Sequence, residues 1–509
     1  MSFPQTDNRT LEFPYQNIGF DAEVAHSRKS RPSCCFFACC SGCLLFLLLF
    51  ALGIFALWYC LVSGGAPLEV SPETTIIVGP LKSDGKTVDY HRAIQNMLQA
   101  DTPPNGNAFR DVLLGYGIGV LGTEDIRVND IEYFALCDEL GVDPKTPVTL
   151  FLDSPSPAAP QEWLGLVEEG LNVVQTAAAK PHYFVPLVQE DSRDLVLMSQ
   201  PLGVYAFHKE LSDAFRFRAD MRFQSGENAE AWQDILASVR LFRHVTINQA
   251  WLAALEGKND ESFLTPVAQV AATLPNWTQE QLEQAIKDLE SLPTGQDRKT
   301  TLTMMQFMLL DMISAANDWD NLQYHLVGRI PREMRDVSDM LRFVAFDWNL
   351  VAKGLNQEFK TYGELLESAS DKSLEEQFGM LGLRLPRERR SKPLNEEMLN
   401  QVLFRHFEAE GSADFLFTPG RSKLMGAIVG QQLVSWAAGE MYRLQIMEES
   451  RCQTLRLALA LERYHREHLQ YPDSLHDLGL EPMTPNMHIQ YEKRDTGYRV
   501  RNMVFEWSK

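Results

Sequence analysis

The chain has 509 residues, of which 45% are hydrophobic and 23% charged, so it is long enough for two to four domains with real cores. The formal net charge of −21 argues against a nucleic-acid-binding protein, because such a protein needs basic surface to displace counterions from phosphates. The composition also excludes collagen-like, disulfide-scaffold and low-complexity classes, but it names no reaction.

An uncharged apolar run near the N-terminus predicts a membrane-spanning helix. No charged residue occurs from Pro32 to Leu68. Leu44–Val62 holds eight Leu, three Phe, one Ile and one Val, which together favour insertion by about 4–8 kcal/mol. Phe36–Val62 is long enough to cross the hydrocarbon core with some tilt. A buried core helix is the alternative, but such helices rarely lack any polar face.

The flanking charges predict the orientation of this helix. Arg28, Lys29 and Arg31 precede it, and the next charge after it is Glu69. By the positive-inside rule, the N-terminal tail is cytoplasmic and the rest is extracytoplasmic. A cleaved signal peptide is the competing interpretation. The long apolar run, the long preceding tail and Pro67 after the small residues favour an uncleaved anchor.

The cysteines gather at the predicted span. Six of the eight are Cys34, Cys35, Cys39, Cys40, Cys43 and Cys60. Their apolar setting does not suit structural zinc, and acylation is left open. Cys137 and Cys452 are too few for a disulfide framework, and the sequence does not decide whether they pair.

The residues after the anchor predict one short strand and then mostly helices. The β-branched run Thr74–Val78 predicts a strand, and Ser83-Asp84-Gly85 predicts a turn. Pro155–Pro160 and Pro181–Pro201 are expected to be irregular. Helices are expected near 89–100, 107–116, 124–140, 301–316, 333–354 and 396–407.

The strongest helical patterns lie in the second half. Apolar spacing predicts a helical hairpin over Phe215–Phe242 with Gly226 at its turn. Thr278 with Gln281 predicts a capped helix start. A long helical stretch, 425–469, is expected with a break near Ser450.

The C-terminus predicts a helix packed on a small hairpin. Pro472 ends the helix, and strands are expected over Met487–Glu492 and Tyr498–Phe505. The Leu457–Leu461–Tyr464 stripe would be covered by Ile489, Tyr491, Tyr498 and Val500, which alternate at strand period.

This ending carries a resemblance. Its sequence Tyr-Pro-Asp-Ser-Leu-His-Asp-Leu (471–478) resembles the end of many large envelope proteins of planctomycete-type bacteria, and also the head of type II secretion pseudopilins. Stretches 74–90, 218–243 and 450–464 resemble the envelope family in the same order. The resemblance covers nearly the whole part after the anchor. It implies a single-pass membrane protein with a mainly helical outer part and no assigned activity.

The chain departs from the pseudopilin pattern. It has no short basic leader with a Gly-Phe-type cleavage site and a following Glu. The expected Asp-Pro aromatic loop is replaced by Glu481-Pro482-Met483-Thr484-Pro485, which puts a calcium role of that loop in doubt. A pilus subunit is therefore disfavoured.

Candidate chemical motifs are weak, and we assign no catalytic, cofactor-binding or metal-binding residue. Gly117–Gly122 fits the dinucleotide glycine pattern but follows a predicted helix instead of a strand. His465 and His468 lack the zincin spacing. His406 with Glu408 and Glu410 reads as a polar helix face. The Trp-Asp pairs at 318–320 and 347–348 are typical of helix packing. Serine-hydrolase, P-loop and EF-hand motifs are missing from the sequence.

The sequence therefore predicts a mainly α protein with a transmembrane helix and a small α+β C-terminal element. The expected parts are a disordered cytoplasmic tail (1–33), a transmembrane helix (34–62), a mixed, mainly helical region (63–201), a helical core region (202–450) and a helix-plus-hairpin module (451–509). We expect a non-catalytic interaction or scaffold protein of the cell envelope, without cofactor. Its expected partners are the lipid bilayer and other envelope proteins, with no nucleic acid. The alternative is an envelope hydrolase with an unrecognised site, and a deep polar pocket would discriminate the two.

Overall fold

The computed structural model describes somewhat more than half of the chain, in separate stretches. These are residues 50–56, 58–100, 102, 106–116, 130–143, 160–187, 203–248, 270–292, 298–315, 345–369, 376, 417–479, 489–494, 497–501 and 506–508. The chain divides into two compact units, 1–59 and 60–509. The predictions for 1–33, Gly117–Gly122, 318–320 and 396–410 lie outside the described residues.

The predicted membrane span is described only at its end. Residues 50–56 and 58–62 are helical, and Phe50, Phe55 and Trp58 are each more than half exposed. Within the described part of the chain, no helix combines the length and the apolarity that crossing a bilayer requires. Most of the predicted span, 34–49, lies outside that part.

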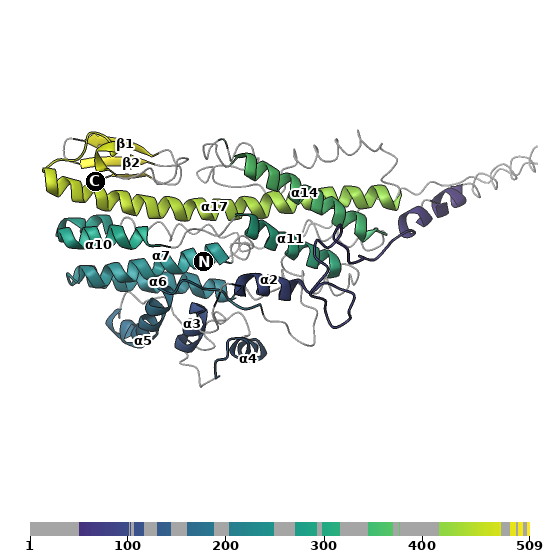
Figure 1. Cartoon of the computed structure of the whole chain (residues 1–509), viewed down its shortest axis with the longest axis horizontal. Coiled ribbons are helices and arrows are strands. Elements are labelled where there is room, and N and C mark those ends of the chain that lie inside the picture. Colours follow the sequence, from purple (N-terminus) through teal and green to yellow (C-terminus); the bar gives the residue numbers. More distant parts are fainter. Residues whose placement is uncertain are drawn as a thin grey trace, which may run out of the picture. The chain divides into compact units, whose positions relative to one another are not determined.

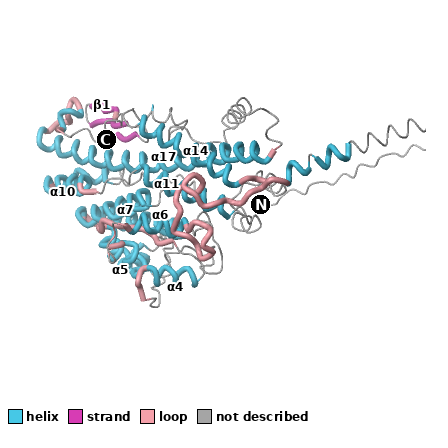
Figure 2. The backbone as a smooth tube through the Cα atoms, turned by 45° about the vertical axis from the view of Figure 1, so that its right-hand side comes forward, coloured by secondary structure: helices cyan, strands magenta, loops and turns pink. Residues whose placement is uncertain are grey.

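The second unit is mainly helical, as predicted (Figures 1 and 2). Its elements are α2 (Tyr90–Gln99), α3 (Ala108–Tyr116), α4 (Asp130–Glu139), α5 (Pro160–Ala178), α6 (Gly203–Gln224), α7 (Asn228–Asn248), η4 (Leu274–Asn276), α10 (Gln279–Glu290), α11 (Arg298–Ala315), α14 (Trp348–Ala369), α17 (Thr418–His468), η6 (Leu475–Leu478), β1 (Gln490–Arg494), β2 (Gly497–Arg501) and β3 (Glu506–Ser508).

The predicted helical hairpin is α6 and α7. Gly226 occupies its turn at φ +80°, a conformation that glycine adopts at low cost. Arg218 and Asp234, each 0% exposed, pair across the hairpin at 2.5 Å, and Arg222 adds a second contact to Asp234 at 2.8 Å. A core formed with α3, α4 and α5 covers the hairpin.

Helix α5 was not predicted. Pro160, predicted to end a Pro/Ser-rich loop, is the first residue of this helix. Proline is favoured there because the first helical N–H has no partner within the helix. Helix α4, Asp130–Glu139, lies within the predicted helix 124–140, and residues 117–129 lie outside the described residues.

The predicted strand at Thr74–Val78 is wrong, because residues 72–75 form a turn. The Thr74 hydroxyl donates to the Glu69 carbonyl at 2.5 Å, and the Thr75 hydroxyl donates to the Ser71 carbonyl at 2.8 Å. Such local side-chain bonds compete with the ladder of a strand. The turn at Ser83–Gly85 is confirmed, with Gly85 at φ +64°.

Helix α17 is 51 residues long and runs through Ser450, so the predicted break there is wrong. At 1.5 Å per residue it measures about 76 Å. It packs against α14 and α11 and also against α7, α10, η4 and η6 (Figure 1). Its last residue is His468, and Leu469 follows in the left-handed conformation at φ 57°.

Helices α14 and α17 lie parallel and touch through glycines. A Cβ on Gly426 would lie 2.5 Å from the Val351 carbonyl oxygen and 3.1 Å from the Gly354 Cα. A Cβ on Gly430 would lie 2.8 Å from the Glu358 Cβ. Helix α14 spans Trp348–Ala369, so the predicted helix 333–354 is wrong at its C-terminal boundary, and 333–344 lie outside the described residues.

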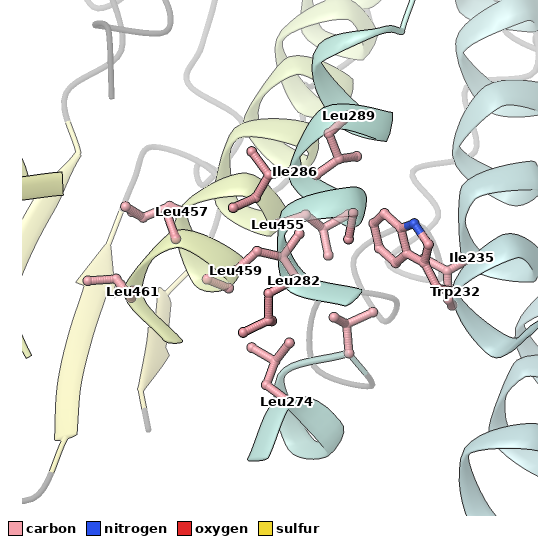
Figure 3. Packing of buried hydrophobic residues seen from close by; sticks show 14 of the residues in the cluster. Trp232, Ile235, Leu274, Leu282, Ile286, Leu289, Leu455, Leu457, Leu459 and Leu461 are labelled. Carbon is pink, nitrogen blue, oxygen red and sulfur yellow. The ribbon is translucent and has the colours of Figure 1, made fainter. Parts of the chain in front are cut away.

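The C-terminal module has the predicted packing. Antiparallel strands β1, β2 and β3 form one sheet in that order. Leu457, Leu461, Tyr498 and Val500 are buried in one core, and Tyr464, Ile489 and Tyr491 pack against it. Figure 3 shows Leu457 and Leu461 beside the strands, while Leu455 and Leu459 lie toward α10. The third strand was not predicted.

Candidate functional site

The candidate site is the place where the chain leaves the apolar helix and enters the folded unit. We call residues 60–69, 345–349 and 418–422 the anchor junction. The segment 63–67, Ser-Gly-Gly-Ala-Pro, is small and without side-chain bulk. Its own local pattern specifies little structure, so contacts from distant residues position it.

Arg421 is the central side chain of the anchor junction. It lies on the first turn of α17 and is 8% exposed. Its Nη2 donates to the carbonyl oxygens of Cys60 at 3.1 Å and Leu61 at 3.2 Å. It also donates to the Ala345 carbonyl at 3.1 Å. One guanidinium therefore ties three chain segments together.

The charge of Arg421 suits this position. Cys60 and Leu61 belong to the last helical residues, 58–62, whose carbonyls have no partner within the helix. A cation at this helix end also interacts favourably with the negative end of the helix dipole. This interaction typically stabilises the fold by about 0.3–1 kcal/mol. Burial lowers the pKa of Arg421, with Cys60 acting in the opposite direction, but a guanidinium stays charged near neutral pH.

A second set of contacts holds the backbone of the linker. The Thr418 hydroxyl donates to the Ser63 carbonyl at 2.5 Å. Gly64, at φ +80°, passes so close that a Cβ would lie 3.2 Å from the Thr418 Oγ1. The Ala66 amide donates to the Phe346 carbonyl at 3.2 Å, and the Trp348 amide donates to the Ala66 carbonyl at 3.0 Å. The linker is thus paired like a short strand.

The polar residues before and inside α14 complete the anchor junction. Asp347 accepts from the Asn349 amide at 3.0 Å, which caps the helix start, and its own amide donates to the Ser422 hydroxyl at 2.8 Å. The Asn349 side chain donates to the Pro67 carbonyl at 2.9 Å and accepts from the Glu69 amide at 2.8 Å. The Asp347-Trp348 pair of the sequence thus contributes a helix cap.

A second polar cluster is buried among aromatic rings. The Tyr183 hydroxyl and the His208 Nε2 are hydrogen-bonded, and the His244 ring stacks on Tyr183 at a centroid distance of 5.3 Å. His244 Nε2 lies 3.2 Å from the Ala178 carbonyl oxygen. Burial lowers the pKa of His244 to about 4, so its ring is neutral at physiological pH.

This histidine cluster packs one segment onto the hairpin. Tyr183, His208 and His244 are 1%, 5% and 3% exposed, so none presents a reactive atom to solvent in this conformation. The three side chains come from the segment 181–187, from α6 and from α7. Their contacts hold that segment against the helices, and we do not assign them a catalytic role.

The histidines singled out in the sequence lie on tyrosine rings. His465 stacks on Tyr471 at 4.4 Å, and His468 stacks on Tyr464 at 4.0 Å. Across the described stretches, no group of three or more His, Cys, Asp or Glu side chains is arranged to hold a metal ion. His406, Glu408 and Glu410 lie outside those stretches.

Sequence reasoning missed the anchor junction. Arg421 is 361 residues from Cys60, and no local spacing indicates such a contact. The sole available signal was indirect: a Pro at the second position of α17 marks a helix start, and a basic residue follows two positions later.

Comparisons with models of protein families, with curated proteins and with solved structures gave no match. The resemblance to planctomycete-type envelope proteins and to the pseudopilin head therefore stays a prediction.

Proposed function

We propose that this chain is a single-pass membrane-anchored scaffold or interaction protein of the cell envelope, with an extracytoplasmic folded unit. The observation that carries the proposal is the anchor junction. An apolar helical segment with exposed Phe, Leu, Ile and Trp side chains ends in carbonyls that Arg421 binds. A helix end that folded structure binds in this way suits a membrane anchor that must stay attached to the folded unit.

The length of α17 supports a scaffold role. The helix begins at the anchor junction with Thr418 and Arg421, and its other end packs on the C-terminal sheet through Leu457 and Leu461. One continuous element thus links the base of the folded unit to its C-terminal module over about 76 Å. A continuous helix of this length suits a scaffold that holds its C-terminal module at a set distance from the anchor junction.

Membrane retention tests the anchor. Leu52→Arg with Ile54→Arg adds two charges to the apolar run, at a cost of about 5–7 kcal/mol near the bilayer centre. This cost cancels the favourable insertion of about 4–8 kcal/mol worked out for Leu44–Val62. We expect the double variant to leave the membrane fraction in alkaline extraction, whereas the wild-type chain stays.

The control places the same two charges on the folded unit. Leu114→Arg with Leu166→Arg changes side chains that are 50% and 65% exposed on α3 and α5, so retention should be unchanged. Equal extraction of both double variants and the wild type would refute the anchor. Protease treatment of intact spheroplasts tests the orientation: protection of the folded unit with cleavage of the tail would show it to be reversed.

A further inference from the structure

The loop that follows the anchor junction exposes an unusual amount of apolar surface. We call residues 76–81 the apolar loop. Ile76, Val78 and Leu81 are 38%, 59% and 41% exposed. Ile77, between the first two, turns inward and packs on the core of α2, α11 and α14. Scattered exposed aliphatic residues are ordinary, but three within six residues form a local patch.

The backbone holds the three side chains outward. Ile76 has φ 66°, a left-handed conformation that is costly for a β-branched residue. The inward hydroxyl of Thr75 keeps the chain there, because it donates to the Ser71 carbonyl at 2.8 Å and can also reach the Ile77 carbonyl at 2.8 Å. Because the Thr75 side chain is held inward, the side chain of the next residue, Ile76, is exposed.

Backbone hydrogen bonds tie the apolar loop to the residues on either side of it. The Ile77 amide donates to the Thr75 carbonyl at 2.7 Å, and the Asp89 amide donates to the Pro80 carbonyl at 2.8 Å. The Lys82 amide donates to the Thr87 carbonyl at 2.8 Å. These bonds fix the course of the chain on both sides of the apolar loop.

The apolar loop is tied to the anchor junction along α14. Asn349 binds Glu69, Lys353 pairs with Glu73 at 2.6 Å, and Asn356 donates to the Thr74 carbonyl at 3.0 Å. From Asn349 to Asn356 the helix rises about 10 Å, so these contacts hold the apolar loop close to the anchor junction. Figure 2 shows this part of the chain, between the apolar helix and α2, as loop.

Charge at the apolar loop fits a lipid surface. Lys86 is exposed on the turn that follows the apolar loop. The exposed carboxylate of Asp84 on this turn accepts from the amides of Lys86 and Thr87 and from the Thr87 hydroxyl. A lysine within a few residues of exposed aliphatic side chains is a combination found at surfaces that bind anionic lipid headgroups.

We infer that the apolar loop is a second membrane contact, in which Ile76, Val78 and Leu81 enter the headgroup–acyl boundary and Lys86 faces lipid phosphates. This inference rests on the proposed anchor. The bilayer is the occupant that the structure favours, because the patch is continuous with the anchor junction through residues 69–74. Other exposed apolar residues, such as Leu166 on α5, lack that connection.

Photocrosslinking in the full chain tests the inference. A benzoylphenylalanine is placed at Val78, at Phe55 in the apolar helix or at Leu166 in separate preparations. Each is reconstituted in nanodiscs of equal parts phosphatidylcholine and phosphatidylglycerol, irradiated and analysed by mass spectrometry. We expect lipid adducts at Val78 and Phe55, several-fold above those at Leu166. These three sites are exposed in the structure, so the substitutions should not disturb folding.

The three positions separate the possible failures. Lipid adducts at Phe55 but not at Val78 would overturn the second contact and leave the anchor standing. Adducts at neither position would contradict both. Equal adducts at Val78 and Leu166, or adducts of Val78 to another protein chain, would also overturn the second contact, because the patch would then not select lipid.

Discussion

The parallel contact of α14 and α17 gives the sharpest test of the structure. Gly426 lies where the two helix backbones meet, and a Cβ there would be 2.5 Å from the Val351 carbonyl oxygen. Because the opposing atom is backbone, rotation of a side chain cannot relieve the clash, and α14 must shift. Gly426→Ala therefore combines a destabilising clash with a stabilising gain in helix propensity, and typical magnitudes are known for both.

The relative sizes of these two effects decide whether Gly426→Ala raises or lowers the free energy of unfolding. Overpacking of a close contact typically costs 1–3 kcal/mol, and a backbone clash belongs at about the upper end. Alanine gains about 1 kcal/mol over glycine in a helix interior. We expect Gly426→Ala to lower the free energy of unfolding by about 2 kcal/mol.

Gly363→Ala is the matched control on α14. Its Cβ would meet a single atom, the Leu302 Cδ2 at 3.7 Å, which is ordinary van der Waals contact. The helix-propensity gain then stands alone, and we expect stabilisation by about 0.5–1 kcal/mol. The same chemical change thus has opposite signs at two positions of one helix pair.

The assay compares urea midpoints of the purified full chain, followed by tryptophan fluorescence. Both variants must show an unchanged slope, because a changed slope would indicate a change in the unfolding unit. If Gly426→Ala were as stable as Gly363→Ala, the close approach of α14 and α17 would be refuted.

Three other variants test separate parts of the fold. Leu461→Ala truncates a fully buried side chain and should cost about 2–5 kcal/mol by thermal unfolding; a negligible loss would contradict the packing of α17 on the sheet. Leu469→Gly replaces a left-handed, 86% exposed residue at the end of the same helix and should stabilise by about 1 kcal/mol, so a lower melting temperature would contradict it. Because the pKa of His244 is about 4 in the folded chain against 6.5, the unfolded chain binds the extra proton, and stability should fall by about 3 kcal/mol as pH drops from about 6.5 to about 4. Urea midpoints measured across that range should lose this part of the pH dependence in His244→Gln; an identical dependence in the variant would refute the assignment.

Local signals in the sequence located several elements correctly. Thr278 and Gln281 form the predicted capping box, with the Thr278 hydroxyl accepting at 3.2 Å and the Gln281 side chain accepting at 2.8 Å. The α6–α7 hairpin followed from apolar spacing and from Gly226. These features depend on residues within a few positions of one another, so the sequence alone was enough.

Long-range packing accounts for what the sequence did not predict. The strand expected at Thr74–Val78 follows from β-branched composition, but the buried hydroxyls of Thr74 and Thr75 bind nearby carbonyls and bend the chain. The anchor junction depends on bonds from Arg421 to Cys60 and between Asn349 and Glu69, which join residues 361 and 280 positions apart. A single sequence contains no local pattern for such contacts.

The unbroken course of α17 shows tertiary packing overriding a local preference. Serine is a modest helix former, and a break near Ser450 was reasonable from local sequence. Ser450 is 0% exposed, however, and its carbonyl accepts from the Thr454 hydroxyl at 2.9 Å. The neighbouring Arg451 lies over the Phe242 ring of α7 at 5.2 Å. Contacts with α7 therefore stabilise the continuous helix at this point.

This continuity has a consequence for the proposed scaffold. Arg421 and Leu461 lie 40 residues apart on one helix, which is about 60 Å. An isolated helix of that length would bend gently under thermal motion, but α14, α11, α7 and α10 flank it. The C-terminal sheet is therefore connected to the anchor junction by a helix that packs against four other helices, and not by a flexible linker. A partner bound at the sheet would then be held at a fixed distance from the anchor junction.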